Sequence, residues 1–328
     1  MSEHLSALIV GCGNIAGGYD EARTGDEVLS HAGAYGCHPR FTVSACVEPD
    51  EARRAAFMEH WNVADGFANL ADCRASGMEF DVASICVPTA AHEGVLREVL
   101  GMPVRAVFCE KPLSGAVETS RALVTDFASA GRPLCVNYLR RWMADMDRVR
   151  QSIASGEWGA VQSVVGHYTK GIMNCGSHMI DLLHFLVGPL TPTDVFKKRV
   201  DFDANDPTLD ALLFTQGGAP VYLVGSDSRD FFTFEIEITT QKGRVVIEDQ
   251  GAAMRFRHVA NNPLFPAYRV LERGEWTATD LGSAMVSAVD NLARHLDHGD
   301  PLASDGHSAL EAENVCARLL ELAEERLS

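Results

Sequence analysis

Gly11-Cys12-Gly13-Asn14-Ile15-Ala16 is the stretch that decides the fold class of this sequence. It has the pattern GxGxxA and directly follows a short apolar run, Ala7–Val10. Glycines at a turn from a buried strand into a helix let the backbone approach a pyrophosphate, whose charge the helix N-terminus favours. A glycine-rich turn without a ligand is the alternative, but the position after a first strand favours a dinucleotide. The predicted cofactor contacts in this turn are Gly11, Gly13, Asn14 and Ile15.

Short apolar runs alternate with helix-like segments through the first part of the chain. The later runs are Phe41–Val47, Asp81–Val87, Val104–Cys109 and Leu134–Asn137. The helix-like segments between them are Asp50–His60, Ala91–Leu100 and Ala116–Ala130. Apolar strands separated by helices are typical of a parallel sheet that is covered on both faces. We therefore expect a doubly wound α/β domain of the Rossmann type over residues 1–137.

The pattern changes after Tyr138, where strands with period-two alternation replace the apolar runs. Phe232, Phe234, Ile236 and Ile238 would point to one face, and the polar residues between them to the other. This alternation indicates an open, antiparallel or mixed sheet with helices on one side. Helices are expected over Met143–Ser155, Gly282–His298 and Asp305–Arg326. Residues 138–328 are thus predicted to form a second α+β domain with an open, mostly antiparallel sheet.

Composition excludes several classes of partner. The 328 residues suggest about two domains. With 28 Lys and Arg against 45 Asp and Glu, the formal net charge is −17. Such a chain repels nucleic-acid phosphates and anionic lipid, so neither nucleic acid nor membrane is an expected partner.

Cysteine usage and the N-terminus bear on the compartment. The nine cysteines include no CxxC pair and fit neither a zinc ribbon nor a disulfide framework. Met1-Ser2-Glu3-His4 does not resemble the start of a signal peptide, and no apolar run approaches the roughly 18–20 residues of a membrane span. We expect a protein of the reducing cytoplasm.

Glu48 ends the second apolar run and is the candidate for adenosine recognition. A carboxylate at this place accepts hydrogen bonds from a ribose, which favours NAD over NADP. Arg53 and Arg54 follow on the next helix and could admit a 2′-phosphate. The distance from Gly11 is longer than usual because Tyr19–Ser30 looks like an insertion that interrupts the first helix. The alternative is that Glu48 is only a solvated strand end.

Two further strand ends carry candidate residues, because ligands of open α/β sheets bind beyond the carboxyl ends of the strands. Glu110-Lys111-Pro112 ends the fifth strand, so Lys111 is expected to point toward the cofactor. A surface lysine in a loop is the alternative. Beyond the fourth strand lie Val87, Pro88, Thr89 and then His92. The predicted cofactor contacts at these two ends are Val87, Pro88, Thr89, His92 and Glu110.

The segment Asn174–His184 enters a helix in the second region. Asn174 or Ser177 could cap this helix, and His178 and Asp181 share one of its faces. His184 lies six residues beyond His178 and is turned away from it, so the two histidines cannot chelate one metal ion. No metal site is predicted. A structural histidine is the alternative for His178.

In this order, these motifs resemble the Gfo/Idh/MocA oxidoreductases, the group of glucose–fructose oxidoreductase and inositol 2-dehydrogenase. The resemblance covers nearly the whole chain. It implies a Rossmann domain and an open-sheet domain for substrate binding and oligomerisation, with the nicotinamide at their interface. It also implies hydride transfer between NAD, or NADP, and a secondary alcohol or ketone of a sugar, cyclitol or nucleotide sugar. A homodimer or homotetramer is the implied assembly.

By the same resemblance, Lys111 matches the active-site lysine and His178 the general acid/base. Asn174 stands where many members have Asp, and an amide can orient a group but cannot act as a base. This departure leaves proton transfer to His178. The predicted substrate-facing residues are Asn137, Arg140, Tyr168, Lys170 and Asp181. Arg140, Arg141 and Lys170 could together hold a phosphate, and the alternative is that the two arginines are solvated at the start of a helix.

Two rival functions remain open. In one, a tightly bound NAD oxidises a sugar carbon transiently, to allow elimination, epimerisation or glycoside cleavage. In the other, the protein is a sensor of a dinucleotide or sugar and catalyses nothing. A sensor has no need of a proton relay, so the presence of both Lys111 and His178 favours an enzyme.

Overall fold

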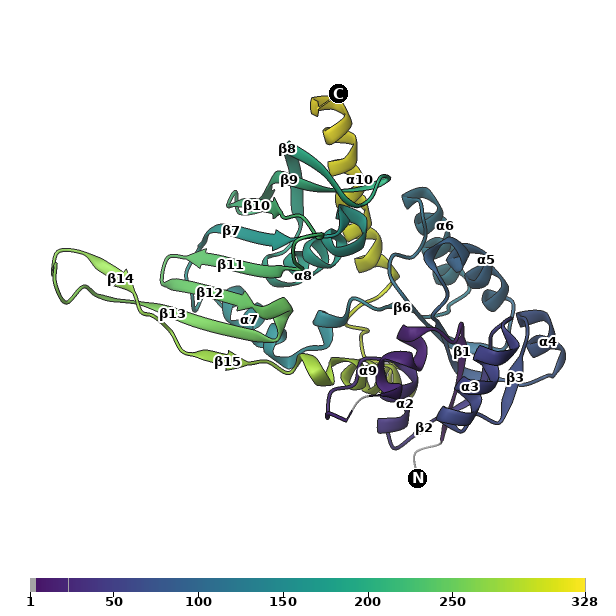
Figure 1. Ribbon diagram of the computed structural model, residues 1–328. Helices are drawn as coiled ribbons and strands as arrows, with labels where there is room; N and C mark the ends of the chain where they lie inside the picture. Colours follow the sequence, from purple (N-terminus) through teal and green to yellow (C-terminus); the bar gives the residue numbers. More distant parts are fainter. Residues whose placement is uncertain (1–3, 23, 328) are drawn as a thin grey trace. The chain divides into compact units, whose positions relative to one another are not determined.

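The computed structural model describes residues 4–22 and 24–327 and divides into two compact units (Figure 1). Unit 1 comprises Met1–Trp142 and Gly282–Leu310, and unit 2 comprises Met143–Leu281 and Glu311–Ser328. The expected domains, 1–137 and 138–328, are continuous in sequence, whereas the observed units interleave. Met1, Ser2 and Glu3 of the expected N-terminus lie outside the described residues.

Unit 1 is built on a six-stranded sheet in which every pairing is parallel. The spatial order is β3-β2-β1-β4-β5-β6, which confirms the predicted doubly wound sheet. The order reverses between β1 and β4, so their carboxyl ends form a natural crevice for a ligand. The strands are β1 (Leu5–Val10), β2 (Phe41–Val47), β3 (Asp65–Phe67), β4 (Phe80–Ile85), β5 (Val104–Cys109) and β6 (Leu134–Val136).

The helices of unit 1 include one break that the sequence predicts. A π-helical turn η1 (Asn14–Gly18) and a short α1 (Tyr19–Glu21) follow the glycine turn, and helix α2 starts only at His31. The Asp20 carboxylate connects the two ends of the segment between α1 and α2: it accepts hydrogen bonds from the Leu29 and Ser30 amides and from Ser30 Oγ. The remaining helices are α2 (His31–Cys37), α3 (Glu51–Trp61), α4 (Leu70–Ala75), α5 (Thr89–Leu100), α6 (Val117–Ser129), η2 (Leu139–Trp142) and α9 (Ala284–His298).

Unit 2 is built on a nine-stranded mixed sheet, which confirms the predicted open and mostly antiparallel architecture. Its order is β14-β13-β12-β11-β7-β10-β9-β8, with β15 also paired to β13, and only β7 and β10 pair in parallel. The strands are β7 (Val161–Tyr168), β8 (Leu190–Asp203), β9 (Asp206–Thr215), β10 (Pro220–Gly225), β11 (Phe234–Thr240), β12 (Gly243–Glu248), β13 (Ala253–Asn261), β14 (Arg269–Leu271) and β15 (Trp276–Ala278).

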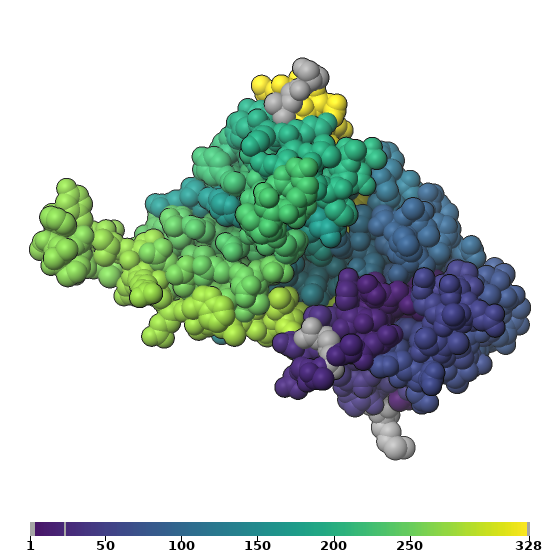
Figure 2. All heavy atoms as spheres, in the orientation of Figure 1, coloured from purple at the N-terminus to yellow at the C-terminus, as the bar shows by residue number. Residues whose placement is uncertain are grey.

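The predicted alternation in β11 is confirmed except at its start. Phe234, Ile236 and Ile238 are buried, but Phe232 precedes the strand and is 44% exposed. Helices α7 (Ala144–Ala154), α8 (Ser177–Val187) and α10 (Gly306–Leu327) accompany the sheet. Beyond it, the hairpin of β13 and β14 projects from unit 2 (Figure 2). The segment that joins these two strands exposes Leu264 and Phe265. Within the described part of the chain, no helix has the length and apolar character that crossing a membrane requires.

Candidate functional site

A cavity of about 720 Å³ lies in unit 1 beyond the carboxyl ends of β1, β2 and β4. This size suits a cofactor site. Seven of the residues predicted to bind the cofactor line it: Gly11, Gly13, Asn14, Ile15, Glu48, Val87 and Pro88. The other lining residues include Tyr19, Arg53 and Asn69, which were not predicted as cofactor contacts or, for Arg53, only as an alternative contact for a 2′-phosphate.

The glycine turn has the geometry that its motif predicts. Gly11 has φ +89°, and a Cβ there would lie 2.9 Å from both Cγ1 and the backbone N of Val87. Only glycine therefore fits between the end of β1 and the turn after β4. A Cβ on Gly13 would meet open space, so the backbone at this position is accessible from the cavity. Such a cradle at the start of a helical segment suits a pyrophosphate.

Glu48 is only 4% exposed and is therefore not a solvated strand end. Its Oε2 accepts a hydrogen bond from the Cys12 amide at 3.0 Å, and its Oε1 accepts one from the Asp50 amide at 3.1 Å. Arg53 Nη1 lies 3.6 Å from Oε2. A carboxylate has about four acceptor sites, so hydroxyls of a ribose can still be bound. Arg54 instead donates to the Glu48 carbonyl oxygen, which leaves Arg53 as the arginine of this pair that lines the cavity.

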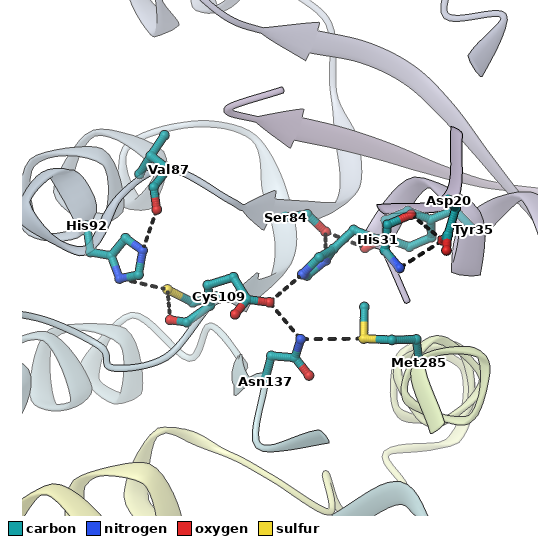
Figure 3. A network of polar contacts seen from close by, with 11 residues as sticks. Asp20, His31, Tyr35, Ser84, Val87, His92, Cys109, Asn137 and Met285 are labelled. Carbon is teal, nitrogen blue, oxygen red and sulfur yellow. Dashed lines mark hydrogen bonds and ion pairs between the residues drawn. The ribbon is translucent and has the colours of Figure 1, made fainter. Parts of the chain in front are cut away.

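The carboxylate of Glu110 belongs to a buried polar network rather than to the cavity lining. Figure 3 shows its partners His31 and Asn137, with Ser84 and Tyr35 beyond the imidazole. Its Oε1 accepts hydrogen bonds from His31 Nε2 at 3.0 Å and from Asn137 Nδ2 at 2.6 Å. On the other side of the imidazole, Ser84 Oγ lies 3.0 Å from Nδ1, and Tyr35 Oη lies 2.8 Å from Ser84 Oγ. A carboxylate only accepts, so Nε2 of His31 carries a hydrogen that it donates to Glu110.

The groups around Glu110 determine the charge of its carboxyl group. Burial would raise the pKa of Glu110, but the hydrogen bond from His31, its charge, the Asn137 amide and the charge of Lys111 together hold that pKa below its ordinary value. Glu110 therefore carries a negative charge directly beside Lys111 in the chain.

His92 links the segment that follows β4 to the segment that follows β5. It is 1% exposed, with Nδ1 2.8 Å from the Pro112 carbonyl oxygen and Nε2 2.9 Å from the Val87 carbonyl oxygen. Neither His92 nor Thr89, the first residue of α5, lines the cavity. His92 thus supports the turn after β4 and the segment that follows Lys111. Lys111 itself is half-buried.

In unit 2, Asn174 and His178 lie where a π-helical turn, η3 (Gly171–Gly176), runs into α8. Both side chains are half-buried. The helix has no side-chain N-cap: Ser177 Oγ donates back to the Asn174 carbonyl oxygen at 3.0 Å, and Gly176 occupies the cap position. Neither predicted cap therefore forms, because the π-helical turn already leads the backbone into the helix.

The predicted substrate-facing residues are dispersed between the units. Asn137 and Arg140 belong to unit 1, where Asn137 is buried against Glu110 and Arg140 lies in η2. Tyr168 in unit 2 is fully buried, and its hydroxyl both donates to the Leu209 carbonyl oxygen and accepts from the Leu209 amide. Main-chain atoms thus occupy that hydroxyl, and Tyr168 is a core residue. Asp181 is also buried, whereas Lys170 is half-exposed at φ +67°.

Comparisons with known proteins agree with this architecture. A model of an oxidoreductase family with an NAD-binding Rossmann fold matches residues 5–138. An inositol 2-dehydrogenase of Corynebacterium glutamicum (strain R) is 32% identical over 160 residues, which cover 44% of this chain and 46% of that protein. An inositol 2-dehydrogenase of Burkholderia lata is 25% identical over 342 residues, covering 96% of this chain and 93% of that protein.

A solved structure extends the likeness to both units. The WlbA dehydrogenase of Bordetella pertussis, in complex with NADH and UDP-GlcNAcA, has a TM-score of 0.79 and 19% identity and covers 99% of this chain and 97% of its own. At this identity the likeness concerns the fold. Among the curated relatives, the first matches span about half of the relative's length.

Proposed function

We propose that the chain is a Gfo/Idh/MocA oxidoreductase, since residues 5–138 match the model of an oxidoreductase family with an NAD-binding Rossmann fold, and that it transfers a hydride between NAD and a secondary alcohol or ketone of a sugar-like substrate. The observation that carries the proposal is the cavity of unit 1, in which Gly11, Gly13 and Glu48 meet at the switch point of a parallel sheet. The substrate class is a sugar, cyclitol or nucleotide sugar, by analogy with the inositol and nucleotide-sugar dehydrogenases that are similar to the chain.

The residues of the cavity divide the cofactor between them in this proposal. The backbone of Gly11 and Gly13 binds the pyrophosphate, and Glu48 accepts hydrogen bonds from the adenosine ribose. NADP is a second possible cofactor, because the Arg53 guanidinium beside Glu48 suits a 2′-phosphate. When bound, the nicotinamide supplies the hydride chemistry.

Proton handling falls to side chains of this chain. His178 takes the hydroxyl proton when the alcohol is oxidised, because an imidazole titrates near neutral pH. Lys111 donates a hydrogen bond to the same oxygen and stabilises the negative charge that develops on it. The Asn174 amide orients the substrate or His178 and has no proton to exchange near neutral pH. Lys170 and Arg140 are proposed contacts for the outer part of the substrate.

We also propose that the protein is a cytoplasmic homodimer or homotetramer. All nine cysteines lie in the described part of the chain and none forms a disulfide there, which agrees with a reducing compartment. Exposed aromatic residues on unit 2, such as Phe196 and Tyr222, support self-association.

The experiment is a redox screen of the purified protein. NAD or NADP is mixed with inositols, aldoses, uronic acids and UDP-sugars, and NADH or NADPH absorbance is followed, with product analysis in parallel. Reduction of NAD with one substrate class supports the proposal. Absence of both NAD binding and turnover across the panel contradicts it. A changed sugar without net NADH would favour the tightly bound cofactor instead.

A further inference from the structure

The turn η3, which carries Asn174 and leads to His178, is bound by side chains of the neighbouring β8–β9 hairpin. Asp206, the first residue of β9, accepts hydrogen bonds from two consecutive amides of the turn. Its Oδ1 lies 2.7 Å from the Met173 nitrogen, and its Oδ2 lies 2.9 Å from the Asn174 nitrogen. One carboxylate thus fixes the backbone amides of both Met173 and Asn174.

The turn is shaped to receive this carboxylate. Gly171 has φ +81°, and a Cβ at this position would lie 2.2 Å from Asp206 Oδ2 and 2.8 Å from the Asp206 carbonyl oxygen. Any side chain at position 171 would therefore displace the carboxylate. The Gly171 amide itself donates to Thr208 Oγ1 at 2.8 Å, so the next inward residue of β9 holds the start of the turn.

A second carboxylate on the hairpin fixes the residue before the turn. Asp201 is 7% exposed, and its Oδ2 accepts hydrogen bonds from the amides of Lys170 at 3.0 Å and Ser228 at 2.9 Å. Thr208 Oγ1 donates to Asp201 Oδ1 at 2.7 Å. Burial would raise the pKa of Asp201, but these hydrogen bonds hold it below its ordinary value, so the carboxylate is charged.

These contacts support a segment whose backbone conformation is unfavourable by itself. Lys170 has the left-handed φ of +67°, which is unfavourable for a residue with a side chain. A π-helical turn is also rare in proteins. Backbone of this kind persists where its surroundings impose it, and here two carboxylates and a hydroxyl bind three amides of the turn and the amide of Lys170 before it.

We propose that Asp206 is a positioning residue that fixes the backbone at Asn174 and thereby sets where Asn174 and His178 stand during proton transfer. This inference rests on the proposed function. Asp206 itself exchanges no proton with the substrate; it acts through the backbone of the turn. The cofactor cavity belongs to unit 1, so loss of Asp206 should leave cofactor binding intact.

The test compares D206A and D206N with D203N. Asp203 is exposed on the same hairpin, and its carboxylate accepts the Asn205 amide. D206A should lower kcat by roughly 10- to 100-fold, the size expected for loss of hydrogen bonds to a charged acceptor. D206N keeps one acceptor oxygen but turns an NH₂ group toward the other amide, so it should recover only part of the loss. D203N should match the wild type, and the Kd for NAD should be unchanged in all three.

Hydrogen exchange of the segment 171–176, measured without substrate, separates this inference from the proposed function. Exchange should be roughly tenfold faster in D206N than in the wild type and unchanged in D203N. Faster exchange in a protein whose wild type oxidises no sugar would contradict the proposed function alone. Wild-type kcat and exchange in D206N would overturn the inference. If D206A does not fold, T208V, which removes the acceptor for Gly171 and the donor to Asp201 but leaves Asp206 in place, is measured instead and should give a smaller effect of the same kind.

Discussion

Replacement of His31 by Phe tests the buried network behind Lys111. The His31 ring is fully buried and packs on Phe108 with ring centroids 4.5 Å apart, so a phenyl ring preserves most of the volume. The substitution removes the hydrogen bond to Glu110 and leaves Ser84 without its imidazole partner. The Glu110 carboxylate keeps only the Asn137 amide and the attraction of Lys111.

The expected loss follows from this remaining support. Loss of a hydrogen bond to a charged group costs about 1.5–3 kcal/mol, and the burial of His31 favours the upper end, about 3 kcal/mol. For a domain of this size, about 2–4 °C is lost per kcal/mol, so Tm should fall by about 6–12 °C.

The loss should depend on pH in one direction. The pKa of Glu110 is lowered in the folded state, so the stability it contributes is present above its ordinary value of 4.5 and disappears as the pH falls through the lowered value. H31F removes the main group that lowers this pKa. The difference between H31F and the wild type should therefore be largest near neutral pH and shrink below about pH 4.5.

Urea unfolding followed by circular dichroism, between acid and neutral pH, measures both effects. H38F is the matched control, because His38 is also largely buried but faces a half-exposed carboxylate, Asp290, at 3.7 Å. Its cost should stay below about 1 kcal/mol. A loss for H31F no larger than that of H38F, or one that grows as the pH falls, would refute the reasoning about Glu110.

The remaining predictions concern the proposed site. G11A should weaken NAD binding by roughly tenfold or more, because its Cβ would meet Val87 at 2.9 Å, and a titration of NAD against the purified variant measures this. E48A should weaken NAD binding by about 10- to 100-fold and NADP binding less. Equal losses for both cofactors would assign the effect to the lost bond with the Cys12 amide instead of ribose recognition. K111A should lower kcat by about 10²- to 10³-fold while NAD still binds. Wild-type turnover in K111A would remove Lys111 from the reaction.

The sequence predicted what depends on short-range patterns. The apolar runs located five of the six strands of unit 1 and the helices between several of them, and GxGxxA located the cradle of the cavity. Strand β3 has only three residues, none of them buried, so it leaves no apolar run. Asn69, which lines the cavity, could have been noticed as an N-cap three residues before Asp72.

Such short-range patterns could not predict contacts between residues that lie far apart in the sequence. His31 lies 79 residues from Glu110, and Asp206 lies 32 residues from Asn174, so no local spacing connects them. Tyr168 was expected beside a substrate because of the family resemblance, but strand alternation turns its side chain into the core. The rule that ligands bind beyond the carboxyl ends of parallel strands placed Lys111, Glu110 and His92 near one another. It could not predict that the side chains of Glu110 and His92 turn into the interior of unit 1.

The return of α9 to unit 1 has a consequence for biosynthesis. Met285, Val289 and Leu292 belong to the same hydrophobic core as Leu5, and Ser304 exchanges two hydrogen bonds with Val136. A nascent chain that has emerged from the ribosome only as far as Trp142 therefore lacks the residues of α9 that complete the hydrophobic core of unit 1. Final closure of the N-terminal sheet must wait until translation has passed residue 304, so the unit made first is completed late.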